Sequence, residues 1–149
     1  MKLARLRRND SGQAILEVAL IAPVMILLLI GAIDLGRLSQ FDTKLAASAR
    51  AGAQFGASNL VNAANDAGMV AAALNEAQSN AALPTVVATS YCECYGGTAT
   101  TCTVGMCASS HRLLFVKVTA SGKFVPIFHY FKSMDSLTPS RTVILQVGQ

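Results

Sequence analysis

The amino-acid sequence predicts an α+β protein with a long N-terminal helix, a second helix and a small antiparallel β-sheet. Residues 14–33 are an almost unbroken apolar run, and apolar residues then recur every three or four positions. The second half of the chain instead alternates β-branched with polar residues. The first two patterns are typical of helices and the third of strands. Among the 149 residues, 52% are hydrophobic and 13% charged, a balance that excludes an intrinsically disordered protein.

The positive charge of the chain is concentrated at its N-terminus. The formal net charge is +4, and residues 1–12 hold four basic side chains against one acidic side chain. The rest of the chain is therefore nearly neutral, and we expect no nucleic-acid partner. We interpret residues 1–12 as a basic leader peptide that lies on the cytoplasmic side of a membrane segment.

Residues 13–34 are predicted to be a transmembrane helix. The twenty residues 14–33 contain Glu17 as their only charge, and at ~1.5 Å per residue they span about 30 Å, the thickness of a bilayer's hydrocarbon core. The apolar stretch of a cleaved secretory signal is shorter, about 7–15 residues. Because basic residues precede the span, we expect the N-terminus in the cytoplasm and an extracytoplasmic domain over residues 35–149.

Glu17 needs an explanation, because an acidic side chain inside a membrane costs roughly 2.5–3.5 kcal/mol. In one interpretation its carboxylate reaches the cytoplasmic headgroups from one helical turn inside the bilayer. In the other, a protease cuts after Gly12, where glycine suits an extended backbone, and exposes Gln13 as a new α-amino terminus. Glu17 then becomes the fifth residue and neutralises the Gln13 ammonium of a neighbouring subunit. The residues alone leave both interpretations open.

The N-terminal segment resembles a known family. A basic leader, a glycine, four mostly apolar residues, a glutamate and an apolar helix resemble the class III signal of type IV pilins and pseudopilins. The stretch R-R-N-D-S-G-Q-A-I-L-E-V-A-L-I-A-P-V-M-I-L-L-L-I-G-A-I-D-L-G-R is similar to the N-terminus of TadE/TadG-like proteins of tight-adherence (Tad, type IVc) pilus systems. Further points of likeness over residues 7–56 are Pro23, the cluster Gly31-x-x-Asp34-x-Gly36-Arg37 and the run Ala46-Ala47-x-x-Arg50-Ala51-Gly52-Ala53.

The resemblance implies a minor pilin or pseudopilin and not a major pilin. Val18 stands where tight-adherence pilins often have an aromatic residue, and the chain is far longer than their short major pilins. The implied partners are a prepilin peptidase that cleaves between Gly12 and Gln13, other pilin subunits, and the Tad secretion and assembly machinery. Glu17 is then the acid used in assembly of a pilus for surface attachment.

The implied location is the bacterial inner membrane as a single-pass protein, with the N-terminus cytoplasmic and the C-terminal domain periplasmic or extracellular, or incorporated into the pilus. The resemblance implies no enzymatic activity. The alternative function is an uncleaved single-pass anchor that presents a disulfide-stapled extracytoplasmic binding domain.

Beyond the membrane segment the helical pattern continues as a stalk to about residue 57. Its small residues let either the protein's own domain or another subunit approach closely. A break is expected at residues 59–65, followed by a second helix over 67–78 that Asn65 or Asp66 can cap. The apolar positions that define these two helices are Leu38, Phe41, Leu45 and Ala49, then Met69, Val70, Ala73, Leu74 and Ala77.

Four strands are predicted in the remainder, over residues 85–91, 113–120, 124–128 and 142–147. Ser121-Gly122 is predicted to be a turn, and Pro126 places the third strand at an edge. The aromatic run over residues 124–131 fits either an edge strand with core residues or a patch on a membrane surface or partner pilin.

The chain's cysteines form the pattern C-x-C-x7-C-x4-C at Cys92, Cys94, Cys102 and Cys107. Outside the cytoplasm we expect two disulfides that join the first two cysteines to the last two, in either of two connectivities. A four-cysteine zinc site is the alternative, but its first half lacks the usual C-x2–4-C spacing. His111 and His129 fit no metal-ligand or catalytic spacing, and no catalytic motif is present. We therefore expect no bound metal, no cofactor and no enzymatic activity.

Overall fold

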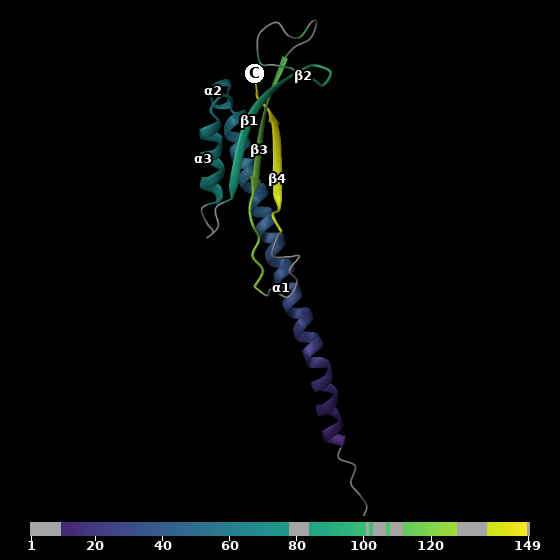
Figure 1. Ribbon diagram of the computed structural model, residues 1–149. Helices are drawn as coiled ribbons and strands as arrows, with labels where there is room; N and C mark the ends of the chain where they lie inside the picture. The colour runs from purple at the N-terminus through teal and green to yellow at the C-terminus, as the bar shows by residue number, and fades with distance from the viewer. Residues whose placement is uncertain are drawn as a thin grey trace, which may run out of the picture. The chain divides into compact units, whose positions relative to one another are not determined.

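The computed structural model describes residues 10–77, 84–100, 102, 107, 112–127 and 137–148. The chain divides into two compact units, Met1–Arg37 and Leu38–Gln149. Helix α1 (Asp10–Ala57) starts in the first unit and ends in the second (Figure 1). The predicted α+β class, with its long apolar N-terminal helix, is confirmed.

In the second unit, two further helices follow α1, namely α2 (Leu60–Ala63) and α3 (Asp66–Ala77). Asn59 and Asn65 cap them, because their side chains accept hydrogen bonds from the backbone N–H groups of Asn62 and Gly68 at 2.8 and 2.9 Å. The predicted second helix is therefore confirmed, with Asn65 as its cap. The short α2 occupies the stretch that we expected to be a simple break.

The β-sheet is antiparallel, in the order β2-β1-β3-β4. Its strands are β1 (Thr85–Cys94), β2 (Thr98–Thr100), β3 (Arg112–Ser121) and β4 (Ser140–Gln146). Three of them correspond to the predicted strands 85–91, 113–120 and 142–147. β2 was not predicted, because three residues are too few for a periodic pattern. The preceding Gly96 and Gly97, both with positive φ, are nevertheless a hairpin signal in the sequence.

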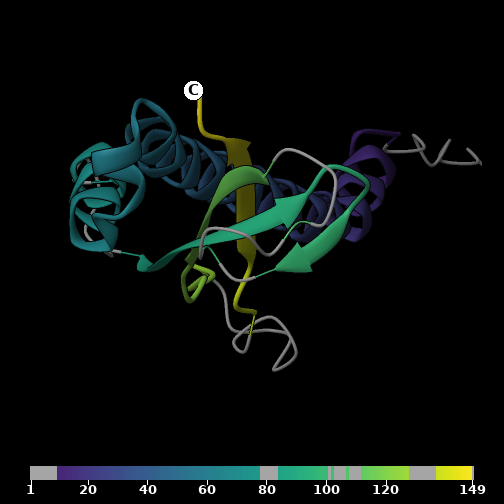
Figure 2. The ribbon, with the colours of Figure 1, turned by 90° about the horizontal axis from the view of Figure 1, so that it is seen from above.

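The core of the second unit lies between one face of the sheet and the helices α1 and α3, as Figures 1 and 2 show. Alternate residues of β3 face these helices, and three of them, Val116, Val118 and Ala120, are completely buried. They contact α1 in reverse order: Val116 lies beside Gly56, Val118 beside Gly52, and Ala120 beside Ala49 and Leu45. β3 and α1 therefore run antiparallel to each other.

Two local predictions near the end of β3 are wrong. Ser121 is the last residue of β3, and Gly122 continues the extended chain where a turn was predicted. Residues 124–127 form no strand, and Phe128 lies outside the described residues. The N–H groups of Gly122 and Phe124 still donate to the carbonyls of Pro139 and Leu137. Because Pro139 has no N–H to return a hydrogen bond to Gly122, the regular ladder ends at the pair Ser121 and Ser140.

Candidate functional site

The predicted junction between leader and anchor, at Gly12 and Gln13, lies near the start of α1. Gly12 and Gln13 lie in the first turns of α1 and are exposed. A Cβ added at Gly12 would meet nothing within 4 Å, so the chain itself places no steric limit on this residue. Glycine lowers helix stability by about 1 kcal/mol relative to alanine, so this first turn of α1 is easier to unwind than it would be with alanine at position 12.

Glu17 lies one turn further along α1, four residues after Gln13, and its side chain is exposed. The i,i+4 spacing places the two residues on the same side of the helix. Neighbouring side chains are apolar, since Ile15, Leu16 and Val18 are all exposed on the same stretch of helix. The sole acid of the apolar run is therefore a charged group on a hydrophobic surface.

The apolar surface of α1 continues around the helix through residue 35. A segment of the helix Gly12–Ala57 has a mean hydropathy of 2.6 and none of that segment is buried. A helix that is apolar on every side and uncovered requires an apolar solvent. The helix is long and apolar enough to be a single-pass membrane anchor. Its exposed large side chains are those of Ile15, Leu16, Val18, Leu20, Ile21, Val24, Met25, Ile26, Leu27, Leu28, Leu29, Ile33 and Leu35.

An ion pair lies at the end of this apolar surface. Arg37 donates a hydrogen bond to Asp34 at 3.3 Å, with the two residues three positions apart on the helix. Asp34 is only 5% exposed, while the Arg37 side chain is 43% exposed. These are the first charged residues after Glu17, so the charge-free stretch of α1 covers residues 18–33.

The small residues of α1 beyond this point pack within the second unit. Gly52, Ala53 and Gly56 are buried against α3 and β3. Ser48, completely buried, donates a hydrogen bond of 2.8 Å to the carbonyl oxygen of Ala73 in α3. The sequence left open whether the protein's own domain or another subunit packs against the small residues of this stretch. At these positions it is the protein's own domain.

A second ion pair joins α1 to the sheet. Arg141 at the start of β4 donates two hydrogen bonds to the Asp42 carboxylate, one of them at 2.6 Å. Both residues lie beyond the apolar run that ends at Ile33. The hydrogen bonds from Arg141, helped by its positive charge, hold the pKa of Asp42 below its ordinary value. The sequence held no indication of this contact, because the partners are 99 residues apart.

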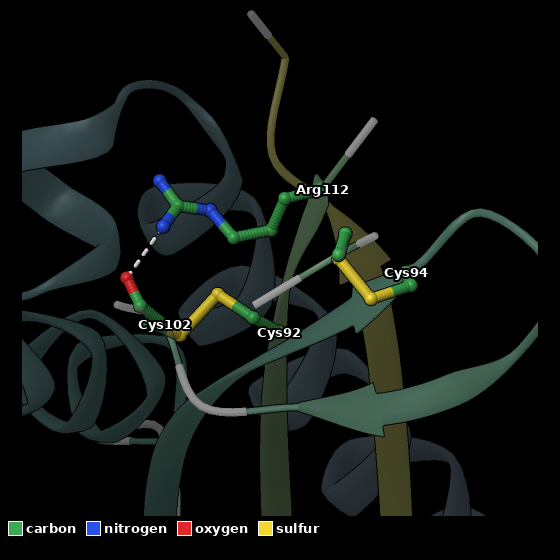
Figure 3. The surroundings of a disulfide bond; sticks show 5 residues. Cys92, Cys94, Cys102 and Arg112 are labelled. Atoms are coloured by element: carbon green, nitrogen blue, oxygen red, sulfur yellow. Dashed lines mark hydrogen bonds between the residues drawn. A yellow bond between two sulfur atoms is a disulfide. The ribbon is translucent and has the colours of Figure 1, made fainter. Parts of the chain in front are cut away.

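The four cysteines form two disulfides at the end of β1. Cys92 is bonded to Cys102 and Cys94 to Cys107, which is one of the two connectivities left open by the sequence (Figure 3). The two β1 cysteines are two residues apart and therefore point to the same face of the strand. Arg112 of β3 donates a 2.6 Å hydrogen bond to the Cys102 carbonyl. Since all four thiols are consumed, the alternative zinc site is excluded.

No group of three or more His, Cys, Asp and Glu side chains in the described part of the chain could hold a metal ion. His111 and His129, and the aromatic residues Phe128, Tyr130 and Phe131, lie outside the described residues. Residues 1–9 of the predicted leader, residues 1–12, also lie outside them.

Comparison with known proteins adds one finding. Residues 12–54 match the family model described as TadE-like protein. No curated protein and no solved structure matches the chain. The match begins at Gly12 and covers the exposed apolar helix and the first part of the stalk that packs in the second unit. The resemblance to TadE-like proteins is thus confirmed over residues 12–54.

Proposed function

We propose that this protein is a minor pilin or pseudopilin of a tight-adherence pilus, cleaved by a prepilin peptidase between Gly12 and Gln13 and then used in pilus assembly. The observation that carries the proposal is the TadE-like match over residues 12–54, which coincides with an uncovered apolar helix. In this role the chain is a substrate and structural subunit, and not an enzyme.

Cleavage would change the charge of the segment that must leave the membrane. The leader residues 1–12 carry a net charge of +3, and removing them leaves a chain whose side chains carry a net +1. A cluster of positive charges on the cytoplasmic side resists transfer across the bilayer. The peptidase therefore removes the main electrostatic obstacle to extracting the anchor, and the new Gln13 ammonium is the charge that remains.

Glu17 supplies the partner for that remaining charge. In a filament of packed helices, the Gln13 ammonium of one subunit and the Glu17 carboxylate of its neighbour neutralise each other where neither is stable alone. Because sliding one helix along the other would leave both groups unpaired, the contact also determines the axial offset between subunits. Exposure of Glu17 on the surface of α1 makes it accessible to a neighbour.

The inner membrane, with the N-terminus in the cytoplasm, is the proposed location. Two observations support this orientation: the basic leader, which marks the cytoplasmic side, and the two disulfides of the second unit. Disulfides persist outside the cytoplasm, in oxidising compartments such as the periplasm.

Substitution of Glu17 tests the assembly role. Glu17→Ala and Glu17→Gln should leave cleavage by the peptidase intact and reduce pilus assembly, because both remove the charge that pairs with Gln13. Glu76→Gln, which removes an exposed acid from α3, is the matched control and should assemble normally. Pili are counted by electron microscopy and cleavage by mass spectrometry. Normal piliation in Glu17→Ala would contradict the pairing argument.

A further inference from the structure

The chain that follows β3 presents a small apolar surface at one end of the second unit. Over residues 122–127, Phe124 and Pro126 are buried, whereas Val125 and Ile127 are 56% and 51% exposed. Lys123 is exposed as well. Because successive residues of an extended chain point to opposite sides, Lys123, Val125 and Ile127 share the outward side. These three residues are named the loop patch.

Contacts inside the second unit show at which end the loop patch lies. The order of contacts between β3 and α1 continues past the strand: Gly122 lies beside Leu45 and Phe41, and the Phe124 ring lies 6.1 Å from that of Phe41. Each step along the extended chain thus leads toward the N-terminal end of the part of α1 that belongs to this unit. That part begins at Leu38, where the chain enters the unit.

The same end of the unit is tethered to the apolar anchor. Phe41 follows Ile33, the last residue of the apolar run, by eight positions, which is about 12 Å of helix. Because so few residues separate Phe41 from the apolar run along the chain, this end of the second unit can reach the headgroup layer. Apolar side chains flanked by a lysine suit that layer, where the apolar part enters the lipid and the ammonium meets anionic headgroups.

We propose that the loop patch is a membrane-surface contact, in which Val125 and Ile127 enter the interfacial layer of the bilayer that holds the anchor and Lys123 meets lipid phosphates. The proposal rests on the membrane anchor of the proposed function. The contact holds the second unit against the membrane before the anchor is withdrawn. A pilin partner on the same surface is the competing occupant, and the experiment below separates the two.

The absence of tryptophan from the sequence makes a direct test possible. Single-tryptophan variants of the full-length protein are reconstituted in vesicles of phosphatidylcholine and phosphatidylglycerol, with and without bromine near the headgroup end of the acyl chains. Ile127→Trp reports on the loop patch. Val61→Trp, at a position on α2 that is 79% exposed, is the control in the same unit, and Leu28→Trp reports on the anchor.

We expect bromolipid to quench the tryptophan fluorescence of Ile127→Trp and Leu28→Trp and to leave the fluorescence of Val61→Trp unchanged. Adding Lys123→Glu to Ile127→Trp should weaken the quenching in vesicles that contain phosphatidylglycerol. If Leu28→Trp is quenched and Ile127→Trp is not, the membrane contact is wrong while the anchor stands. If the tryptophan emission of Ile127→Trp is blue-shifted but not quenched, protein covers the loop patch, and this result also overturns the proposal. If neither is quenched, the anchor itself is refuted.

Discussion

Gly52 and Gly56 let helix α3 lie directly against α1. A Cβ at Gly52 would come within 2.7 Å of the backbone carbonyl oxygen of Met69, whereas a Cβ at Gly56 would meet side-chain atoms, those of Met69 and Val116. A backbone atom cannot move away without shifting α3, but a methionine side chain can change its rotamer. The two glycines therefore differ in how much they tolerate a larger residue.

Alanine substitutions test this difference. Gly52→Ala should destabilise the full-length protein in detergent by about 1–3 kcal/mol, the usual cost of overpacking, and Gly56→Ala should cost less. Gly36→Ala is the control, because a Cβ there meets nothing within 4 Å; it should be neutral or slightly stabilising. Chemical denaturation measures the free energy of unfolding. Equal stabilities for Gly52→Ala and Gly36→Ala would show that α3 does not pack on α1 in this way.

The Asp42–Arg141 pair gives the second unit a predictable response to acid. Because the pKa of Asp42 is lowered in the folded protein from its ordinary 3.8, the pair contributes stability above that value. The contribution is lost as the pH falls through the lower, folded-state pKa. Both side chains are partly exposed to solvent, which keeps the effect small.

We expect Asp42→Asn to be less stable than the wild type at pH 7 and the difference to shrink below pH 3.8. Arg141→Gln should behave in the same way, since it removes the other partner. Unfolding free energies of the three proteins, measured between pH 3 and 7, provide the test. If the difference in unfolding free energy between the wild type and the variants stays constant or grows as the pH falls, the ion pair is contradicted.

At the scale of the elements, the disulfides attach the residues at 102 and 107 to the end of β1. They close segments whose cysteines are 10 and 13 residues apart. Loop-closure entropy gives roughly 3 kcal/mol for each bond taken alone. Because the two closed segments overlap, the second bond restricts a chain that the first has already restricted, and the two contributions should not add fully.

Paired alanine substitutions test this arrangement. Cys92→Ala with Cys102→Ala should cost more stability than Cys94→Ala with Cys107→Ala, because Cys92 is 1% exposed and its loss also leaves a gap in a buried position. The quadruple variant should be less destabilised than the sum of the two pairs. Denaturation with and without reductant measures how much each disulfide contributes to the free energy of unfolding. A quadruple variant as stable as the oxidised wild type would refute the stapling role.

Elements with a local periodic pattern could be predicted from the sequence. The apolar spacing of α1 and α3 and the alternation in β3 and β4 determine which side of each element is buried, so these faces were assigned correctly. The segment over residues 124–127 follows the same alternation but is not a strand; it contains Pro126, which has no N–H to donate. A periodic pattern reports burial, and does not report whether the backbone forms a regular ladder.

Contacts between distant residues could not be predicted in this way. The Ser48–Ala73 hydrogen bond and the Asp42–Arg141 pair join segments 25 and 99 residues apart, and no spacing rule connects them. The cysteine pattern reduced the connectivities to two, and no spacing rule decides between Cys92–Cys102 with Cys94–Cys107 and the other pairing. The junction at Gly12 and Glu17, in contrast, is readable from sequence because it is a linear motif on one helix.

At the scale of the whole molecule, the hydrophobic and the basic residues are concentrated in different segments of the chain. The high hydrophobic share comes in large part from a helix whose apolar surface is uncovered, and the basic charge belongs mainly to residues 1–12. The second unit carries its own core and two disulfides. Such a division is what a subunit needs if its anchor is first held in a bilayer and then packed among the anchors of a filament.

The central claim is that the chain is processed between Gly12 and Gln13, and the mass of the mature protein tests it most directly. The full-length protein is produced in cells with and without the prepilin peptidase of a tight-adherence system, and its intact mass is measured. Gly12→Phe is a suitable control, because Gly12 is exposed and a Cβ there meets nothing within 4 Å, and we expect the bulky side chain to block the peptidase. We expect a chain that begins at Gln13 only when the wild type meets the active peptidase. A wild-type chain that keeps residues 1–12 under those conditions would contradict the account and favour an uncleaved anchor that presents a disulfide-stapled domain.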